Sequence, residues 1–399
     1  MYHLYCRGFQ TILRITSGLL PWRKPILMEG ENSLKQLPGL IKIKGLHKLL
    51  VVTDQGIMSL GLMDDFLSRL ESENIDYIIY DKTVPNPTID NIEEALVLYH
   101  ENKCDSILGF GGGTSIDCAK GVGARVARPK KSLSQMKGLL KVRKKLPPLF
   151  AVPTTAGSGS EATLAAVVTD SRTHEKYAIN DISLIPHYAV LDPVLTLKLP
   201  SQLTAATGMD VLTHAIESYI GKSNTKETYE YSRKAVRLIF ENLWEAYSHG
   251  ENMKARENML KASYYAGVAF TRAYVGNVHA VAHTLGGFYS VPHGLANAVI
   301  LPYVLEYYGD SAAKPLAELA DLVGIGDRED DASAKSAKLI DKIRRMNSDM
   351  GLPDKIKWIE DKDIPTMVER AFHEANPLYP VPMIFSRKDF YQIYQLIRE

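Results

Sequence analysis

Cysteine is scarce in this sequence. Cys6, Cys104 and Cys118 are the three that occur among 399 residues. The number is odd and no two of them have the spacing of a metal-ligand pair, which argues against a disulfide framework and is typical of the reducing cytoplasm. An excess of charge of one sign is missing too, because 47 Lys and Arg residues oppose 46 Asp and Glu residues. The formal charge of +1 gives no long-range field toward nucleic acid or a membrane.

Long apolar runs are also missing. No segment approaches the ~20 apolar residues that a membrane-spanning helix needs. The moderately apolar stretch 8–21 follows Arg7, but no small-residue cleavage site comes after it and polar residues interrupt it: Gln10, Thr11, Arg14 and Thr16. A signal peptide requires an uninterrupted apolar stretch followed by a small-residue cleavage site. We therefore interpret this stretch as a segment packed on the folded protein and not as an export signal.

The length and the apolar patterning predict two domains, since single domains typically run ~100–200 residues. In the first half, the helical segment 89–102 lies among short apolar strands, which we place at 49–53, 77–80, 106–110 and 149–153. Continuous apolar strands separated by helices predict a mostly parallel sheet that is covered on both faces.

The pattern changes near Pro200. Helix-forming stretches without convincing strands follow, at 201–220, 226–248, 251–270 and 311–323. We therefore predict an α/β domain over 1–198, in which 1–25 is an N-terminal extension, and an all-helical domain over 199–399.

A glycine-rich turn predicts where a dinucleotide binds. Gly111, Gly112 and Gly113 follow the strand 106–110 and open a helix. Helix N-termini bind anions through unpaired N–H groups, and glycines let the backbone approach a pyrophosphate. Thr114 and Ser115 can cap this helix and donate to phosphate oxygens. The turn matches neither the P-loop nor the Rossmann fingerprint, so by itself it is also compatible with a plain turn.

Two further features support a nucleotide site. Asp54 ends the strand 49–53, where a carboxylate would accept hydrogen bonds from an adenosine ribose and repel a 2′-phosphate; taken alone, it would be a helix cap. The second turn, 153–161, places small and hydroxyl residues at the end of another strand. Two such turns in one domain favour a ligand site over ordinary loops.

Histidines and one aspartate form the strongest pattern. Asp210 and His214 are spaced i,i+4, as are His279 and His283, and His293 follows shortly after. This spacing places two side chains on one helix face, close enough to share a metal. Each residue alone fits a core histidine or a surface pair, but the combination beside small residues predicts a metal site. Imidazoles with one carboxylate suit Fe(II) or Zn(II).

Four motifs resemble those of the iron-containing (group III) alcohol dehydrogenases, relatives of glycerol dehydrogenase and dehydroquinate synthase. They are GGGTSID, PTTAGSGSE, TGMDVLTHAIE and HAVAHTLGGFYSVPHG. The resemblance extends over roughly 25–395 and implies a dehydroquinate synthase-like architecture, with an α/β NAD-binding domain before an all-α metal-binding domain. It also implies that the metal ligands are Asp210, His214, His279 and His293. His283 matches the histidine that stays off the metal, near substrate and nicotinamide, and is the implied catalytic residue.

The resemblance also assigns cofactor and substrate positions. It places Asp54 at the ribose, Gly112 and Gly113 at the pyrophosphate, and Thr154, Thr155 and Lys176 around the ribose and nicotinamide. Asn86, Asp117 and Thr196 match further cofactor-side positions. Thr114, Ser115 and Ser158 complete the two turns. Ala165 and Phe270 match substrate-facing positions and suggest a pocket roomier than one for propanediol-sized alcohols.

The function that we expect is that of a metal-dependent, NAD-linked alcohol dehydrogenase. The metal acts as a Lewis acid on the substrate oxygen while a hydride passes to C4 of nicotinamide. Fe(II) is the expected metal, with Zn(II) or Ni(II) as alternatives, and Asp54 disfavours NADP. The expected partners are a small alcohol or aldehyde and other copies of the chain, as a dimer or larger homo-oligomer. A zinc glycerol dehydrogenase-like enzyme, a dehydroquinate synthase-like enzyme and a non-catalytic NAD- and metal-binding protein remain alternatives.

Overall fold

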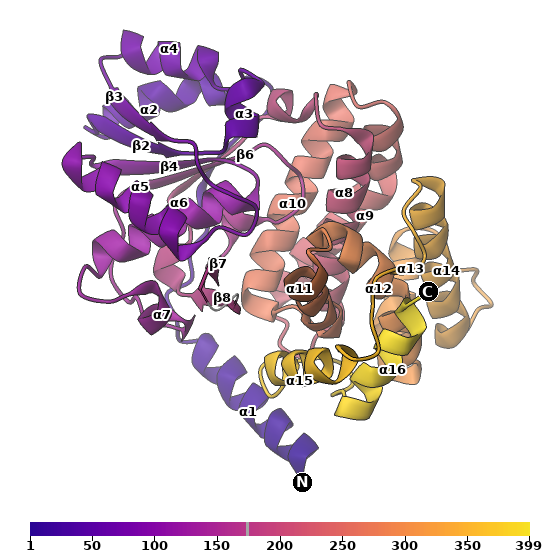
Figure 1. Cartoon of the computed structure of the whole chain (residues 1–399). Helices are drawn as coiled ribbons and strands as arrows, with labels where there is room; N and C mark the ends of the chain where they lie inside the picture. Colours follow the sequence, from indigo (N-terminus) through magenta and orange to yellow (C-terminus); the bar gives the residue numbers. More distant parts are fainter. Residues whose placement is uncertain (173–174) are drawn as a thin grey trace. The chain divides into compact units, whose positions relative to one another are not determined.

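The polypeptide changes its architecture at Lys198. The computed structural model describes residues 1–172 and 175–399. One unit is Pro21–Lys198, and the other combines Met1–Leu20 with Leu199–Glu399 (Figure 1). The first is an α/β unit and the second is built from helices.

A six-stranded parallel sheet forms the centre of the α/β unit. Its strand order is β1-β9-β6-β4-β2-β3. The strands are β1 Ile26–Glu29, β2 Lys48–Val52, β3 Asp76–Tyr80, β4 Ser106–Gly111, β6 Leu149–Pro153 and β9 Tyr188–Leu191. The four strands expected from the sequence are β2, β3, β4 and β6, so the predicted parallel sheet is confirmed.

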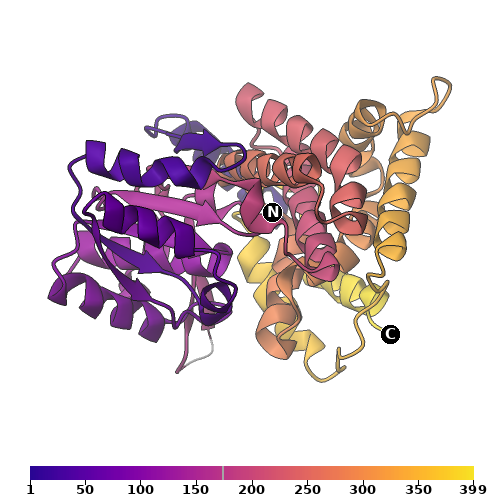
Figure 2. The same cartoon turned by 90° about the horizontal axis from the view of Figure 1, so that it is seen from above.

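Helices lie on both sides of this sheet, as Figure 2 shows, and each face carries a buried apolar core. Along β2, Leu50 belongs to one apolar core and its neighbour Leu49 to the other, because successive side chains point to opposite faces. Helices pack on each side, and the helices of the unit are α2 Leu37–Ile43, α3 Gln55–Ser59, α4 Asp64–Ser72, α5 Ile89–Glu101, α6 Gly113–Ala127 and α7 Leu133–Met136. Short 3₁₀ turns lie at Ser33–Gln36, Ser160–Ala162, Ile182–Leu184 and Pro193–Thr196.

The strand order reverses between β2 and β4. The chain leaves β2 for the outer strand β3 and returns on the other side of β2 as β4. Ligands of open α/β sheets bind at the carboxyl ends of the strands at such a point. Asp54 follows β2 and Gly112 follows β4, so two residues of the expected cofactor site lie at this reversal.

A second, three-stranded sheet was not anticipated from the sequence. Its order is β5-β8-β7, with β7 Ala165–Asp170 antiparallel to β8 Glu175–Asn180 and β5 Gly138–Leu139 parallel to β8. Lys176 lies on β8.

The helical unit contains ten helices among its residues, all of which are described. They are α1 Tyr2–Ser17, α8 Ser201–Ile220, α9 Lys226–Ser248, α10 Met253–Ala273, α11 Asn277–Tyr289, α12 His293–Tyr308, α13 Asp310–Leu322, α14 Ala332–Asp349, α15 Ile364–Ala375 and α16 Arg387–Ile397. Helix α8 is buried over most of its length. Gly208 allows α9 to approach it, since a Cβ there would lie 2.2 Å from Cδ1 of Leu243.

The N-terminal segment belongs with the helical unit, whereas we expected it as an extension of the α/β domain. The Arg7 guanidinium donates to the carbonyls of Val381 and Pro382 at 2.8 and 2.9 Å. These contacts explain the difference, because hydrogen bonds to the C-terminal part of the chain hold α1. Across the described residues, no helix combines the length and apolarity needed to cross a membrane.

Candidate metal centre

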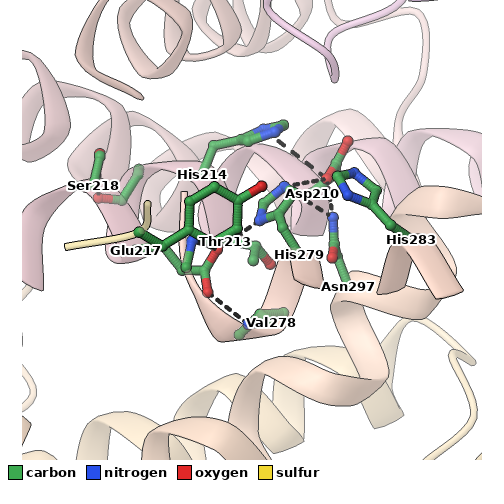
Figure 3. Close-up of polar contacts among 12 residues, drawn as sticks. Asp210, Thr213, His214, Glu217, Ser218, Val278, His279, His283 and Asn297 are labelled. Atoms are coloured by element: carbon green, nitrogen blue, oxygen red, sulfur yellow. Dashed lines mark hydrogen bonds and ion pairs between the residues drawn. The ribbon is translucent and has the colours of Figure 1, made fainter. Parts of the chain in front are cut away.

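The four residues expected as metal ligands come together in the helical unit. Asp210 and His214 lie on α8, His279 lies on α11, and His293 is the first residue of α12. One ligand atom from each lies within 4.8 Å of all the others. Oδ1 of Asp210 is 3.9 Å from Nδ1 of His214 and 3.9 Å from Nε2 of His279 (Figure 3). The same oxygen is 3.7 Å from Nε2 of His293. Donor atoms around a tetrahedral divalent metal lie about 3.4 Å apart, so a small contraction would fit this set to one cation.

The local sequence explains how three helices meet here. The i,i+4 spacing places Asp210 and His214 on one face of α8. Gly294 then allows the first turn of α12 to touch α8, since a Cβ at Gly294 would lie 2.5 Å from the carbonyl oxygen of Ala206. This close approach carries His293 toward Asp210.

The electrostatics favour neutral imidazoles. The pKa of His214 and the pKa of His279 both lie well below the usual value, first because the rings are buried and second because neighbouring imidazoles repel a positive charge. Nδ1 of His214 is buried without a hydrogen-bond partner among the described residues. A neutral imidazole with an unused ring nitrogen is the form that binds a metal.

Glu217 supports the site and was missed by the sequence analysis. Its carboxylate lies 2.6 Å from Nδ1 of His279 and accepts the N–H groups of Gly276 and Val278 at 2.8 and 2.7 Å. An imidazole held in this way by a carboxylate turns its other nitrogen to a metal. The signal was present in the sequence, because Glu217 is seven residues after Asp210 and therefore on the same face of α8.

Asn297 is a second supporting residue that was missed. Its buried Nδ2 donates to Oδ1 of Asp210 at 2.6 Å and lies 3.2 Å from Nε2 of His279 (Figure 3). It also lies 3.2 Å from Nε2 of His293. Two imidazole nitrogens and the carboxylate therefore face a common point, which is the arrangement that a cation requires. The sequence did contain a signal for Asn297, because it follows His293 by four residues and therefore lies on the same face of α12.

His283 lies beside this cluster and outside the four-atom set. Its Nδ1 is 2.5 Å from Oε1 of Glu374, which also accepts the Tyr379 hydroxyl at 2.8 Å. Its ring stacks on that of His293 with a centroid distance of 5.2 Å. Phe270, expected in the substrate pocket, stacks on the His214 ring at 4.3 Å.

The two predicted cofactor turns pack against each other in the α/β unit. The N–H of Thr154 in the second turn donates to the carbonyl of Gly111 in the first turn at 3.0 Å. Ser115 of the first turn also donates to Oδ2 of Asp54, at the end of the neighbouring strand, at 3.3 Å. A Cβ at Gly113 would lie 2.6 Å from Oγ of Ser158.

The other residues of these turns lie close by. A Cβ at Gly112 would lie 3.5 Å from Oγ1 of Thr155, and Thr114 occupies the first turn of α6. Asp54 caps α3 by accepting the N–H of Ile57 at 3.0 Å, so the helix-cap interpretation also holds.

The remaining cofactor-side residues fall into two groups. Lys176 donates to Oδ1 of Asn86 at 2.7 Å, so these two lie together. Asp117 is buried and accepts the N–H of Val167 at 3.0 Å, and Thr196 donates to the carbonyl of Pro193 at 2.9 Å. These contacts give Asp117 and Thr196 structural roles, and their cofactor contacts stay predictions.

A buried charged group beside the second turn was not anticipated. The Lys120 ammonium donates to the carbonyl of Ala165 at 2.7 Å and to Thr163. Burial lowers the pKa of Lys120 to about 8 and raises that of Glu161 to about 7. Ala165, expected to face the substrate, is thus tied to α6 through its carbonyl.

Comparisons with known proteins agree with this geometry. The family model for iron-containing alcohol dehydrogenases matches residues 25–193, and the model for the C-terminal part of the same family matches 204–397. The chain is 39% identical to 1,3-propanediol dehydrogenase of Citrobacter freundii over 353 residues, which cover 87% of this chain and 90% of the relative. The crystal structure of a 1,3-propanediol oxidoreductase is similar with a TM-score of 0.90 and 35% identity, covering 94% of this chain and 98% of that one. Sulfoacetaldehyde reductase from Bifidobacterium kashiwanohense, solved in complex with NAD⁺, is similar with a TM-score of 0.82 and 26% identity, covering 94% and 98%.

Proposed function

The chain belongs to the iron-containing alcohol dehydrogenase family, and from this premise we propose which residues carry the activity of a metal-dependent, NAD-linked alcohol dehydrogenase. The reaction converts a primary or secondary alcohol and NAD⁺ into an aldehyde or ketone, NADH and a proton. The observation that carries the proposal is the convergence of one carboxylate and three imidazoles within 4.8 Å.

Asp210, His214, His279 and His293 would hold the divalent cation, Fe(II) or alternatively Zn(II) or Ni(II). When bound, this ion supplies a Lewis acid that lowers the pKa of the substrate hydroxyl. Glu217 keeps the His279 ring in one orientation, and Asn297 does the same for the Asp210 carboxylate.

His283 is proposed to take the proton of the substrate hydroxyl. Because its Nδ1 faces Glu374 at 2.5 Å, the tautomer with a proton on Nδ1 presents Nε2 as the acceptor. The Glu374 carboxylate then stabilises the imidazolium that forms. The cofactor ribose and water are the competing proton routes.

The cofactor proposal rests on the strand reversal in the α/β unit. When bound there, NAD⁺ supplies the hydride acceptor at C4 of nicotinamide. Gly112, Gly113 and Ser115 would face the pyrophosphate, and the Asp54 carboxylate would bond the ribose hydroxyls and repel the 2′-phosphate of NADP. Thr154, Thr155, Ser158 and Lys176 remain proposed contacts around the ribose and nicotinamide.

The substrate pocket, the cellular location and the oligomeric state remain proposals. Ala165 and Phe270 are candidate substrate-pocket residues, and the substrate is proposed to be an alcohol or aldehyde larger than propanediol. A cytoplasmic location is proposed from the free cysteines. A homo-oligomer is proposed by analogy with the resembled family alone.

One experiment tests the proposal against its alternatives. The protein is purified anaerobically, its metal is quantified, and a panel of alcohols and aldehydes is followed through NADH absorbance, with NADPH run in parallel. We expect turnover of several aliphatic substrates and a higher kcat/KM with NAD(H). Preferential turnover of glycerol would favour the glycerol dehydrogenase-like alternative. Cofactor binding without any net NADH change would favour a lyase-like or non-catalytic protein, and a preference for NADPH would contradict the role of Asp54.

A further inference from the structure

The segment 376–382 follows α15 and has few hydrogen-bond donors of its own. Its sequence is Asn-Pro-Leu-Tyr-Pro-Val-Pro, and the three prolines lack a backbone N–H and prevent a helix. Most of the segment is nevertheless buried. A buried carbonyl without a donor costs free energy comparable to a lost hydrogen bond. The carbonyls of this segment therefore need donors from elsewhere in the chain.

Helix α1 supplies such donors from its buried side. The Gln10 amide donates to the carbonyls of Pro377 at 3.1 Å and Tyr379 at 2.7 Å. The Arg7 guanidinium donates to two further carbonyls at the end of the segment, and also to the Gln10 amide oxygen at 2.9 Å. The two side chains are thus linked to each other, and together they hold the backbone on both sides of Tyr379.

Tyr379 connects this segment to His283. Its hydroxyl donates to Oε1 of Glu374 at 2.8 Å, and the same oxygen lies 2.5 Å from Nδ1 of His283. The Tyr379 side chain is buried, so it has little room to turn away. A displaced Tyr379 backbone would therefore remove one of the two contacts that place this carboxylate oxygen.

Helix α1 also contacts the helix that carries Glu374. The ring of Tyr2 stacks on that of Phe372 with a centroid distance of 5.5 Å, and Figure 1 shows α1 beside α15. Both partners of the hydrogen bond between Tyr379 and Glu374 are therefore supported by α1. Residues 1–24 precede the range that the family models match, so this support comes from outside the matched part of the chain.

We propose that Gln10 and Arg7 are positioning residues for the dehydrogenase reaction, because they fix Tyr379, whose hydroxyl places the Glu374 carboxylate against His283. The inference rests on the proposed function, in which His283 takes the proton of the substrate. A carboxylate partner holds an imidazole in one orientation and one tautomer. A misplacement of about 1 Å at a reacting group can cost about 10²-fold in rate, so the contacts of α1 bear on turnover.

A double-mutant cycle on the anaerobically purified, metal-loaded enzyme tests this inference. Gln10→Leu removes two donors from a buried position, and Tyr379→Phe removes the hydroxyl. Each should lower kcat by about tenfold and leave metal content and the Kd for NAD⁺ at wild-type values. The combined variant should lose no more turnover than Tyr379→Phe alone, because Gln10 acts through that hydroxyl. A merely structural role for Gln10 would lower the melting temperature and leave kcat of the folded enzyme unchanged.

Two further variants complete the test. Ile12→Ala shortens an exposed side chain on the other side of α1 and should keep the wild-type kcat. Arg7→Lys keeps the charge but loses the forked contact to two carbonyls. It should lower kcat by a smaller factor than Gln10→Leu, and it provides the measurement if Gln10→Leu does not fold.

The outcomes separate this inference from the proposed function. The inference alone is overturned if His283→Ala loses turnover while Gln10→Leu and Arg7→Lys keep the wild-type kcat. It is also overturned if the loss in the combined variant equals the product of the two single losses, since Gln10 would then act by another route. If His283→Ala keeps full turnover, the proposed role of His283 fails and the inference fails with it.

Discussion

The Glu217 carboxylate lies 2.6 Å from Nδ1 of His279, and both groups are buried. The same carboxylate accepts two backbone N–H groups at the start of α11. One side chain of α8 therefore fixes both the ring orientation of a metal ligand and the position of the helix that carries it.

The first prediction concerns this contact. Glu217→Gln replaces one of the two acceptor oxygens that hold His279 and the start of α11, and we expect metal affinity to fall by about 10–100-fold, the usual effect of losing such a partner. Competition with a chelator measures the affinity directly. Glu161→Gln, which neutralises a buried carboxylate of the other unit, is the control and should leave metal affinity unchanged. Equal affinities for Glu217→Gln and the wild type would show that the contact serves folding alone.

The second prediction tests the close approach of α12 to α8. Gly294→Ala places a Cβ 2.5 Å from the backbone of Ala206, and the overpacking should cost about 1–3 kcal/mol of stability and shift His293 enough to lower metal retention. Gly287→Ala on α11 is the matched control, since a Cβ there meets nothing within 4 Å. Thermal unfolding and metal content are measured for both variants. A Gly294→Ala protein as stable and metal-loaded as Gly287→Ala would contradict the packing account.

The third prediction separates the cofactor turns from the metal centre. Gly113→Ala would push a Cβ to 2.6 Å from Oγ of Ser158. We expect a raised Kd for NAD⁺ in fluorescence titrations and an unchanged metal content. Adding Ser158→Gly should recover part of the affinity, because it removes the clashing side chain but also a proposed cofactor contact. The role of this turn in cofactor binding is disproved if Gly113→Ala binds NAD⁺ as tightly as the wild type.

The fourth prediction follows from the burial of Glu161. Its pKa is raised from 4.5 to about 7, so between these values the folded protein binds a proton that the unfolded chain has lost. Stability from this group is thus present below pH 4.5 and is lost as pH rises through 7. Glu161→Gln mimics the protonated form, and its melting temperature should match the wild type near pH 5 and exceed it at pH 7. A variant that is less stable than the wild type at pH 7 would show that the carboxylate is stabilising in its charged form.

Spacing within one element could be read from the sequence, and contact between elements could not. The i,i+4 pair of Asp210 and His214 needs only helix geometry, and the strand 106–110 needs only its apolar run. Glu217 and Asn297 become meaningful only when α11 and α12 pack on α8, which periodicity does not reveal. The sequence indicates only that Glu217 shares a helix face with Asp210 and that Asn297 shares one with His293.

Helix α1 shows where the usual rule fails. Apolar periodicity places the apolar face of a helix in the core, yet here Gln10 is buried and Ile12 is exposed. Hydrogen bonds from Arg7 and Gln10 to distant carbonyls decide the orientation. These acceptors lie more than 360 residues away along the chain, beyond the reach of any local pattern.

Metal content and turnover of two histidine variants test the central claim most directly. His293→Ala and His283→Ala are purified anaerobically, and their iron content and NADH-linked alcohol oxidation are measured together. We expect His293→Ala to lose both metal and turnover, and His283→Ala to keep its metal while turnover falls by about 10²–10⁴-fold. A His293→Ala enzyme with full metal content and full turnover would contradict the assignment of the metal centre.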